Sequence, residues 1–339
     1  MLLAMNSNRG DTRVPGDVTK TTGLEPPARV AWRERAARSL VRALARLPLP
    51  LLHTCGDLVG RVIAWFPNRQ RRNALINLTL HSPNRRAKEL IRARNRGLRE
   101  LGKTLFETAP LWLKPPSDAL SLIRDVRGGD LLRRQPGRGL IVLSPHIGAW
   151  ELAGLYLSAQ GPTAIFYKPQ RLLDELIVGA RKRAGATLAP ITARGIRMLL
   201  NALERGDYAG ILPDQEPRED KGAVYAPLFG IPAYTMLLVN RLARRSGVPV
   251  IFMIAERLPR SAGYRIHCLQ APDGIDSDDD VTAAAALNLG IERCIAICPD
   301  QYLWSYRRFR RRPSGGRRVY TGSLRDLDAI ETARHWLVR

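Results

Sequence analysis

Apolar residues form two kinds of run along the central part of the chain. Short continuous runs predict buried strands, and longer runs with an apolar residue every three or four positions predict helices. The predicted strands cover residues 140–143, 163–167, 187–190, 208–212, 248–256 and 264–269, and the predicted helices cover 149–159, 172–184, 196–204, 235–246 and 281–298. This alternation predicts an α/β domain with a mostly parallel central sheet flanked by helices.

The region before this domain has a helical pattern instead. Residues 84–108 place leucines on one side of a predicted helix and arginines opposite. Residues 47–66 are apolar over much of their length, but Pro48, Asp57 and Arg61 make them a poor transmembrane helix. The segment fits a helix that lies in or on a membrane interface, and it equally fits a core helix with basic flanks.

These patterns divide the chain into four predicted regions. Residues 1–28 are polar without periodicity and are predicted to be a disordered tail. Residues 29–115 form a helical, membrane-associating region that ends at a Pro-Pro pair, and 116–312 form the α/β domain. Residues 313–339, which show only a weak helical pattern, are predicted to be a C-terminal tail.

The composition adds a strong positive charge. Fifty-four Lys and Arg against 31 Asp and Glu give a net charge of +23, which implies an anionic partner such as nucleic acid, an anionic membrane, or an acidic protein or lipid. The chain carries no recognisable nucleic-acid-binding motif. The start of the chain lacks a secretory pattern, and its four cysteines do not form a disulfide framework, so we expect a reducing compartment. Neither a metal ion nor a cofactor is expected.

The stretch GLIVLSPHIGAWELAGLYL, residues 139–157, offers the clearest candidate chemistry. It predicts a buried strand, a turn that carries His146, and a helix that begins near Trp150. The carboxyl ends of strands are where α/β sheets place their ligands. Glu151 follows His146 by five positions, and such a carboxylate could hold one ring nitrogen and leave the other as a general base. A structural histidine is the alternative.

Three further segments combine polar, loop-forming or aromatic residues. Asp214 and Gln215 follow a predicted strand, where they could bind substrate, support the histidine or cap a loop. A Gly- and Pro-rich loop contains Lys221 and has Phe229 at an apolar tip, which could line an acyl groove or simply pack on the core. In residues 301–312, aromatics alternate with arginines, which suits a lipid headgroup interface or single-stranded nucleic acid.

Together the segments SPHIGAWE, PDQ with a following KG, APLFGIPAYT and PDQYLWSYRRFRRRP resemble the lipid A late acyltransferases, over about residues 47–313. The resemblance implies a glycerolipid-acyltransferase-like fold at the cytoplasmic face of the inner membrane. It implies acyl carrier protein as acyl donor and a lipid A precursor as acceptor, in lipopolysaccharide biosynthesis. It also implies His146 as general base and Glu151 as its orienting partner. The substrate-binding residues that we expect on this basis are Arg181 or Arg183, Asp214, Gln215, Lys221 and Phe229.

Two departures leave the acceptor open. Residues 216–220 are more charged than the family's usual turn, and Leu228 stands where phenylalanine is common. The pair Trp150-Glu151 also resembles acyltransferases of phosphatidylinositol mannosides, which are the nearest alternative. The rival from another class is a non-enzymatic basic protein that binds membranes or nucleic acid. On the acyltransferase reading no nucleic-acid partner is expected, and the positive charge would steer an acidic carrier protein and a phosphorylated lipid to the site.

Overall fold

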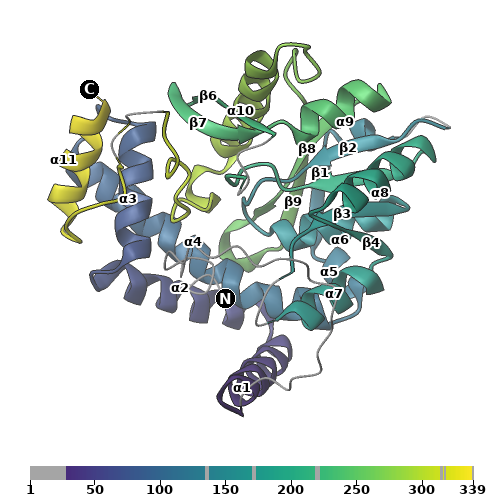
Figure 1. The fold of residues 1–339 in the computed structure, drawn as a ribbon. Helices are drawn as coiled ribbons and strands as arrows, with labels where there is room; N and C mark the ends of the chain where they lie inside the picture. The colour runs from purple at the N-terminus through teal and green to yellow at the C-terminus, as the bar shows by residue number, and fades with distance from the viewer. Residues whose placement is uncertain are drawn as a thin grey trace.

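The structure is a computed structural model, shown in Figure 1, and it describes residues 28–133, 137–169, 173–217, 222–313, 316 and 318–337. The predicted disordered tail therefore lies outside the described residues apart from Ala28, where the first helix begins. Lys221 also lies outside them.

The centre of the molecule is a seven-stranded sheet with the order β1-β9-β8-β2-β5-β3-β4. Only β8 and β9 pair antiparallel, and every other neighbouring pair is parallel. The strands are β1 (Ile123–Arg127), β2 (Leu140–Leu143), β3 (Thr163–Tyr167), β4 (Ala186–Pro190), β5 (Tyr208–Ile211), β8 (Val250–Arg257) and β9 (Tyr264–Gln270). The predicted α/β architecture with a mostly parallel sheet is confirmed.

Helices cover both faces of this sheet, which explains why β2 is apolar at every position. Ile141 and Leu143 belong to the core beneath α8, α9 and α10, whereas Leu140 and Val142 belong to the core beneath α6. The helices of the α/β domain are α5 (Pro116–Leu120), α6 (Trp150–Gln160), α7 (Asp174–Arg183), α8 (Ala193–Glu204), α9 (Leu238–Ser246) and α10 (Asp280–Ile297). Short 3-10 turns lie at Gly129–Leu132, Pro259–Ser261 and Pro299–Gln301.

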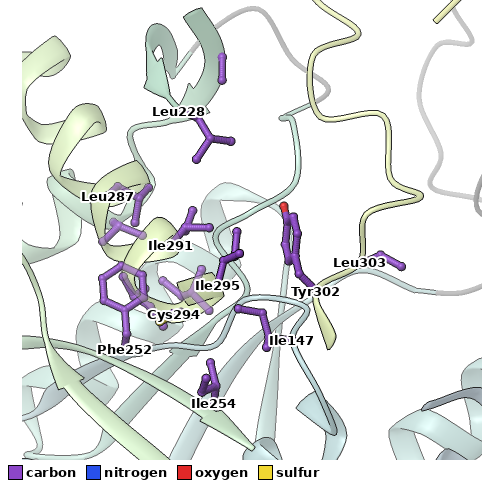
Figure 2. Close-up of a cluster of buried hydrophobic side chains, with 14 of the residues drawn as sticks. Ile147, Leu228, Phe252, Ile254, Leu287, Ile291, Cys294, Ile295, Tyr302 and Leu303 are labelled. Carbon is purple, nitrogen blue, oxygen red and sulfur yellow. The ribbon is translucent and has the colours of Figure 1, made fainter. Parts of the chain in front are cut away.

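Figure 2 shows how one of these cores reaches the candidate site. Leu287, Ile291 and Ile295 on α10 pack near Phe252 and Ile254 of β8. Ile147, in the turn after β2, and Tyr302, after α10, belong to the same buried cluster. The turn that carries His146 is thus packed on a rigid core.

Four helices precede the sheet: α1 (Ala28–Ala45), α2 (Leu49–Trp65), α3 (Arg69–His81) and α4 (Ala87–Leu113). Helix α2 lies directly on α4 because both present glycines at the contact. A Cβ added at Gly102 would lie 1.9 Å from the carbonyl oxygen of Gly56, and one added at Gly60 would lie 2.4 Å from the Cα of Arg99. In the described part of the chain, none of the helices combines the length and the apolar character needed to cross a bilayer.

Two segments of the α/β domain differ from their predicted structure. Residues 223–236 form a hairpin of β6 (Ala223–Leu228) and β7 (Ile231–Met236), where a loop and the start of a helix were predicted. Phe229 and Gly230 both have positive φ, 55° and 74°, which suits a two-residue hairpin turn. Residues 123–127, for which no strand was predicted, form β1, and the short helix α5 before them ends at Leu120.

The C-terminal residues, predicted as a tail, contain helix α11 (Asp326–Leu337), which packs on α3 at the edge of the molecule (Figure 1). Its buried residues include Ala329, Ile330 and Ala333. The Asp326 carboxylate accepts hydrogen bonds from Arg71 at 2.7 Å and Arg94 at 2.7 Å. These contacts tie the end of the chain to the N-terminal helices.

Candidate active site

The candidate site begins with the turn that joins β2 to α6. Gly148 in this turn has a φ of +60°, and a Cβ there would lie 2.1 Å from the carbonyl oxygen of Ala255, so the position requires glycine. The Gly148 amide donates to the carbonyl of Gln301 at 3.0 Å, and the Leu303 amide donates to the carbonyl of His146 at 3.1 Å. The backbone around His146 is therefore held on both sides.

His146 pairs with Asp214, the residue at the matching position of the neighbouring strand. Leu143 of β2 is in register with Ile211 of β5, so the residues three positions beyond each strand end meet. His146 Nδ1 lies 2.8 Å from Asp214 Oδ1, and the His146 backbone amide donates to Oδ2 at 3.1 Å. One carboxylate thus fixes both the ring and the backbone of the histidine.

The second ring nitrogen faces Gln215. Gln215 Nε2 lies 3.2 Å from His146 Nε2, so the amide can donate to that nitrogen when Nδ1 carries the proton. Asp214 is 2% exposed and His146 is 8% exposed. A neutral ring with its proton on Nδ1 presents an unprotonated Nε2 to a reactant, which is the arrangement of a general base.

Asp214 is ionised despite its burial. Burial alone would raise the pKa of this carboxyl. Attraction to the imidazolium form of His146, together with hydrogen bonds from the ring and the backbone amide of His146, outweighs that effect and lowers the pKa. A charged carboxylate at Nδ1 favours the imidazolium that forms when Nε2 takes up a proton.

Glu151 does not hold the histidine ring, contrary to the geometry predicted from its spacing. Both ring nitrogens of His146 face other residues, and Glu151 Oε1 accepts a hydrogen bond from Arg181 at 3.0 Å. Glu151 lies in the first turn of α6, whereas the histidine lies in the preceding turn and points toward β5. The alternative that Asp214 supports the histidine is the one that the geometry favours.

Of the other predicted site residues, Arg181 lies beside Glu151, whereas Arg183 and Phe229 make contacts elsewhere. Arg181 stands over the Tyr167 ring at 5.0 Å and lies beside Glu151, whereas Arg183 donates to the backbone carbonyl of Trp112. Phe229 packs with its ring centroid 4.5 Å from that of His81, and it does not line the cavity beside Glu151 and Arg181.

A narrow, partly enclosed cavity adjoins Glu151 and Arg181. It lies between α6, α7 and the sheet, and most of its wall is apolar. The apolar lining includes Val142, Leu155, Leu157, Ile165, Ile211 and Met253. Trp150 also lines the cavity and contacts the His146 ring, with ring centroids 5.1 Å apart. A mostly apolar wall with a few polar groups, among them the Glu151–Arg181 pair, is typical of small-molecule sites.

Two residues that support the turn were not anticipated from the sequence. The Gln301 side chain both donates to the carbonyl of Arg257 at 2.9 Å and accepts from its amide at 2.8 Å. Thr104 Oγ1 donates to the carbonyl of Gly148 at 3.3 Å. The tripeptide Pro-Asp-Gln occurs at residues 213–215 and again at 299–301, and this repeat is the sequence feature that could have drawn attention to Gln301. Among the described residues, no three His, Cys, Asp or Glu side chains are grouped to hold a metal ion.

Comparison with known proteins identifies the family of the chain. The chain matches the family model for bacterial lipid A biosynthesis acyltransferases over residues 30–311. It is 31% identical over 278 residues to the lipid A biosynthesis palmitoleoyltransferase of Escherichia coli (strain K12), which covers 81% of this chain and 90% of that protein. It is 28% identical over 279 residues to the lauroyltransferase of the same organism, covering 80% and 89%. It is also 24% identical over 273 residues to the myristoyltransferase, covering 78% and 82%. The chain belongs to the bacterial lipid A biosynthesis acyltransferase family.

Proposed function

We propose that the protein transfers a fatty acyl chain from acyl carrier protein to a hydroxyl of a lipid A precursor. The observation that carries this proposal is the buried His146–Asp214 pair, which stands next to a Glu151–Arg181 pair and an apolar cavity. The first pair supplies a base, the second supplies a positive charge, and the cavity accepts hydrocarbon. The relatives named for palmitoleoyl, lauroyl and myristoyl transfer support this substrate class.

The reaction begins with removal of a proton from the acceptor. The acceptor hydroxyl displaces the Gln215 amide from His146 Nε2, and that nitrogen takes the hydroxyl proton as the oxygen attacks the thioester carbonyl. Asp214 retains the Nδ1 proton in its hydrogen bond and stabilises the imidazolium. When the tetrahedral intermediate collapses, the carbon–sulfur bond breaks and the imidazolium returns the proton to the sulfur. No acyl-enzyme is required.

Arg181 stabilises the charge that develops on the carbonyl oxygen. Its guanidinium is held by Glu151 at 3.0 Å and by the face of Tyr167, so it is oriented before the substrate arrives. Glu151 therefore acts through Arg181, and Asp214 acts through His146. This assignment replaces the role first expected for Glu151, and it selects Arg181 over Arg183 as the arginine of the site.

The exposed face of α2 binds the cytoplasmic surface of the inner membrane in this proposal. While the glycines of α2 face α4, its opposite side exposes large apolar residues. These are Leu51, Leu58, Val62 and Trp65, with Phe66 directly after the helix, at exposures of 44%, 62%, 46%, 79% and 61%. Arg42 and Arg46 near the end of α1 are also exposed. Apolar side chains flanked by arginines match an anionic bilayer surface.

The overall charge fits the proposed partners. A net charge of +23 attracts an acidic carrier protein and a phosphorylated acceptor, and long-range attraction of this kind raises the rate of encounter. We do not expect nucleic acid among the partners, since the basic residues accompany an enzyme site.

Purified protein should be incubated with acyl-loaded carrier protein and a tetraacylated lipid A precursor, and the lipid product weighed by mass spectrometry. We expect one added acyl chain, and a rate at least about a hundredfold lower for His146→Ala, because a general base commonly contributes that much. Phosphatidylinositol mannoside serves as the alternative acceptor. Transfer to that lipid alone would support the alternative acceptor. No transfer to either lipid would contradict the proposal, and a rate unchanged in His146→Ala would contradict the role of the base.

A further inference from the structure

Three arginines gather near the start of helix α3. Arg69 and Arg72 are three positions apart on this helix, which makes them neighbours on one side of it. Arg307 is brought to α3 because Asn77 of the helix donates to the backbone carbonyl of Tyr306 at 2.6 Å. Two segments far apart in the sequence thus contribute to one group of positive charges, which we call the arginine cluster.

The charges of the arginine cluster are not neutralised by the described residues. Arg71 pairs with Asp326 at 2.7 Å, whereas no described carboxylate forms an ion pair with a member of the cluster. Arg72 donates to the backbone carbonyls of Gly322 at 2.9 Å and Tyr320 at 3.2 Å, and its buried Nε has no partner in the described part of the chain. Partial burial of Arg72 and the charges of the other two arginines lower the pKa of its guanidinium. Like charges held together in this way favour an anionic ligand.

The arginine cluster lies at the edge of the exposed apolar face of α2. Only Pro67 and Asn68 separate Phe66 from the first residue of α3. The Arg71 side chain also donates to the backbone carbonyl of Trp65 at 2.8 Å, which ties α3 to the end of α2. With the apolar face of α2 on the membrane, the cluster lies at the level of the lipid phosphates.

The segment that carries Arg307 also reaches the candidate active site. The Leu303 amide donates to the carbonyl of His146, and the Tyr306 hydroxyl accepts from the backbone amide of Glu216 at 2.9 Å. Arg307 follows Leu303 by four positions, so their Cα atoms are at most about 14 Å apart. A single large ligand can therefore place one group at His146 and an anionic group at the cluster.

We propose that the arginine cluster binds a phosphate group of the acceptor lipid while the acceptor hydroxyl lies at His146. The inference rests on the proposed acyl transfer and names the part of the acceptor that the enzyme recognises. Guanidinium groups bind phosphate oxygens through charge-assisted hydrogen bonds. A lipid A precursor carries its phosphates on the same disaccharide that bears its acyl chains, so one molecule reaches both places.

The test compares a lipid A precursor with the same lipid after removal of its phosphates. The variant Arg69→Gln/Arg307→Gln removes two charges of the cluster and leaves the hydrogen bonds of Arg72 in place. Its matched control is Arg194→Gln/Arg197→Gln, because both arginines are exposed on α8, on the other side of the molecule from α3 (Figure 1). Each variant loses two positive charges, so a change in long-range attraction affects both alike.

Equilibrium binding of each lipid is measured first, without an acyl donor, in micelles of an uncharged detergent. We expect the unchanged protein and the control to bind the phosphorylated lipid at least about tenfold more tightly, the size typical of hydrogen bonds to a charged group. The cluster variant should lose most of this preference and bind the dephosphorylated lipid as before. Equal binding of the two lipids by the unchanged protein, or a full preference in the cluster variant, would overturn the inference.

Two further measurements separate the acceptor from other anionic partners. Binding to phosphatidylglycerol vesicles tests a general attraction to the membrane, and the KM for acyl carrier protein tests docking of the donor. A cluster variant that is weaker than the control in either measurement, yet keeps its preference for the phosphorylated acceptor, would overturn the inference and assign the cluster to that partner. Absence of transfer to either lipid by the unchanged protein would contradict the proposed function, whereas the binding preference still tests the cluster by itself.

Discussion

Replacing Asp214 by asparagine would test which residue controls the proton on His146. The Asp214 carboxylate accepts two hydrogen bonds, from Nδ1 at 2.8 Å and from the His146 backbone amide at 3.1 Å. An asparagine of the same shape has only one oxygen for these two donors. If its oxygen stays with the backbone amide, its NH2 group donates to Nδ1, which moves the ring proton to Nε2 and removes the base.

The expected loss is large because the proton sits on the wrong nitrogen. The equivalent aspartate-to-asparagine change in a Ser-His-Asp triad lowers kcat by about four orders of magnitude, and we expect a loss on the order of a thousandfold or more in Asp214→Asn. Steady-state transfer from acyl carrier protein should be measured across pH, together with the thermal stability of each variant. Glu151→Gln is the comparison, since it weakens the hold on Arg181 without changing the tautomer.

Two results would refute this reasoning. One is a turnover in Asp214→Asn within about tenfold of the unchanged protein, which would show that the carboxylate does not set the tautomer. The other is a greater loss in Glu151→Gln accompanied by a changed pH profile, with Asp214→Asn retaining the original profile. That pattern would return the orienting role to Glu151.

Three further predictions concern the turn, the buried charges and the membrane face. Gly148→Ala should lower turnover at least about tenfold, because the alanine would strain the backbone and its Cβ would clash with the carbonyl oxygen of Ala255. Gly137 also has a positive φ, +70°, but a Cβ there meets no atom, so the control Gly137→Ala should keep normal turnover. The pKa of buried Glu107 is lowered to about 2, because the charge and hydrogen bonds of neighbouring cations outweigh the effect of burial. A lowered carboxyl pKa stabilises the fold above the unfolded value of 4.5, and this contribution, on the order of 3 kcal/mol, is lost as pH falls toward 2. Unfolding by denaturant between pH 7 and pH 3 should therefore show a steeper loss of stability in the unchanged protein than in Glu107→Gln; equal slopes would contradict it. Trp65→Asp should reduce binding to anionic vesicles at least about tenfold, since a large apolar side chain that becomes buried in the membrane contributes about 1.5–3 kcal/mol. Leu289 is exposed on α10, and the control variant Leu289→Asp should bind the vesicles as the unchanged protein does.

The sequence predicts the central strands well because strands buried on both faces are unbroken apolar runs, whereas the edge strand β1, which is largely exposed, was not predicted. Residues 140–143 show this clearly, and the predicted range coincides with β2. The hairpin β6–β7 was missed because its strands contain Pro227 and Pro232 and mix small with large residues, a pattern that resembles a loop. Helix α11 was weak in sequence because its stability comes from packing on α3 and from ion pairs of Asp326.

The residues of the candidate site could be named from the sequence, but the contacts between them could not. Motif and strand-end reasoning pointed to His146, Asp214 and Glu151, and the family resemblance added Arg181 or Arg183. Spacing along the chain nevertheless suggested a different partner for the histidine from the one in the structure. The pairing of His146 with Asp214 depends on β2 and β5 being neighbours in register, although 68 positions separate the two residues. Strand order is a property of the fold, and one sequence does not specify it.

The central claim is that the protein adds a secondary acyl chain to lipid A through His146. Its most direct test is mass spectrometry of lipid A from cells that lack the gene, complemented with the unchanged protein or with His146→Ala. We predict lipid A that is one acyl chain lighter in the deletion, full restoration by the unchanged protein, and no restoration by the folded variant. Lipid A of unaltered mass in the deletion, or restoration by His146→Ala, would contradict the account.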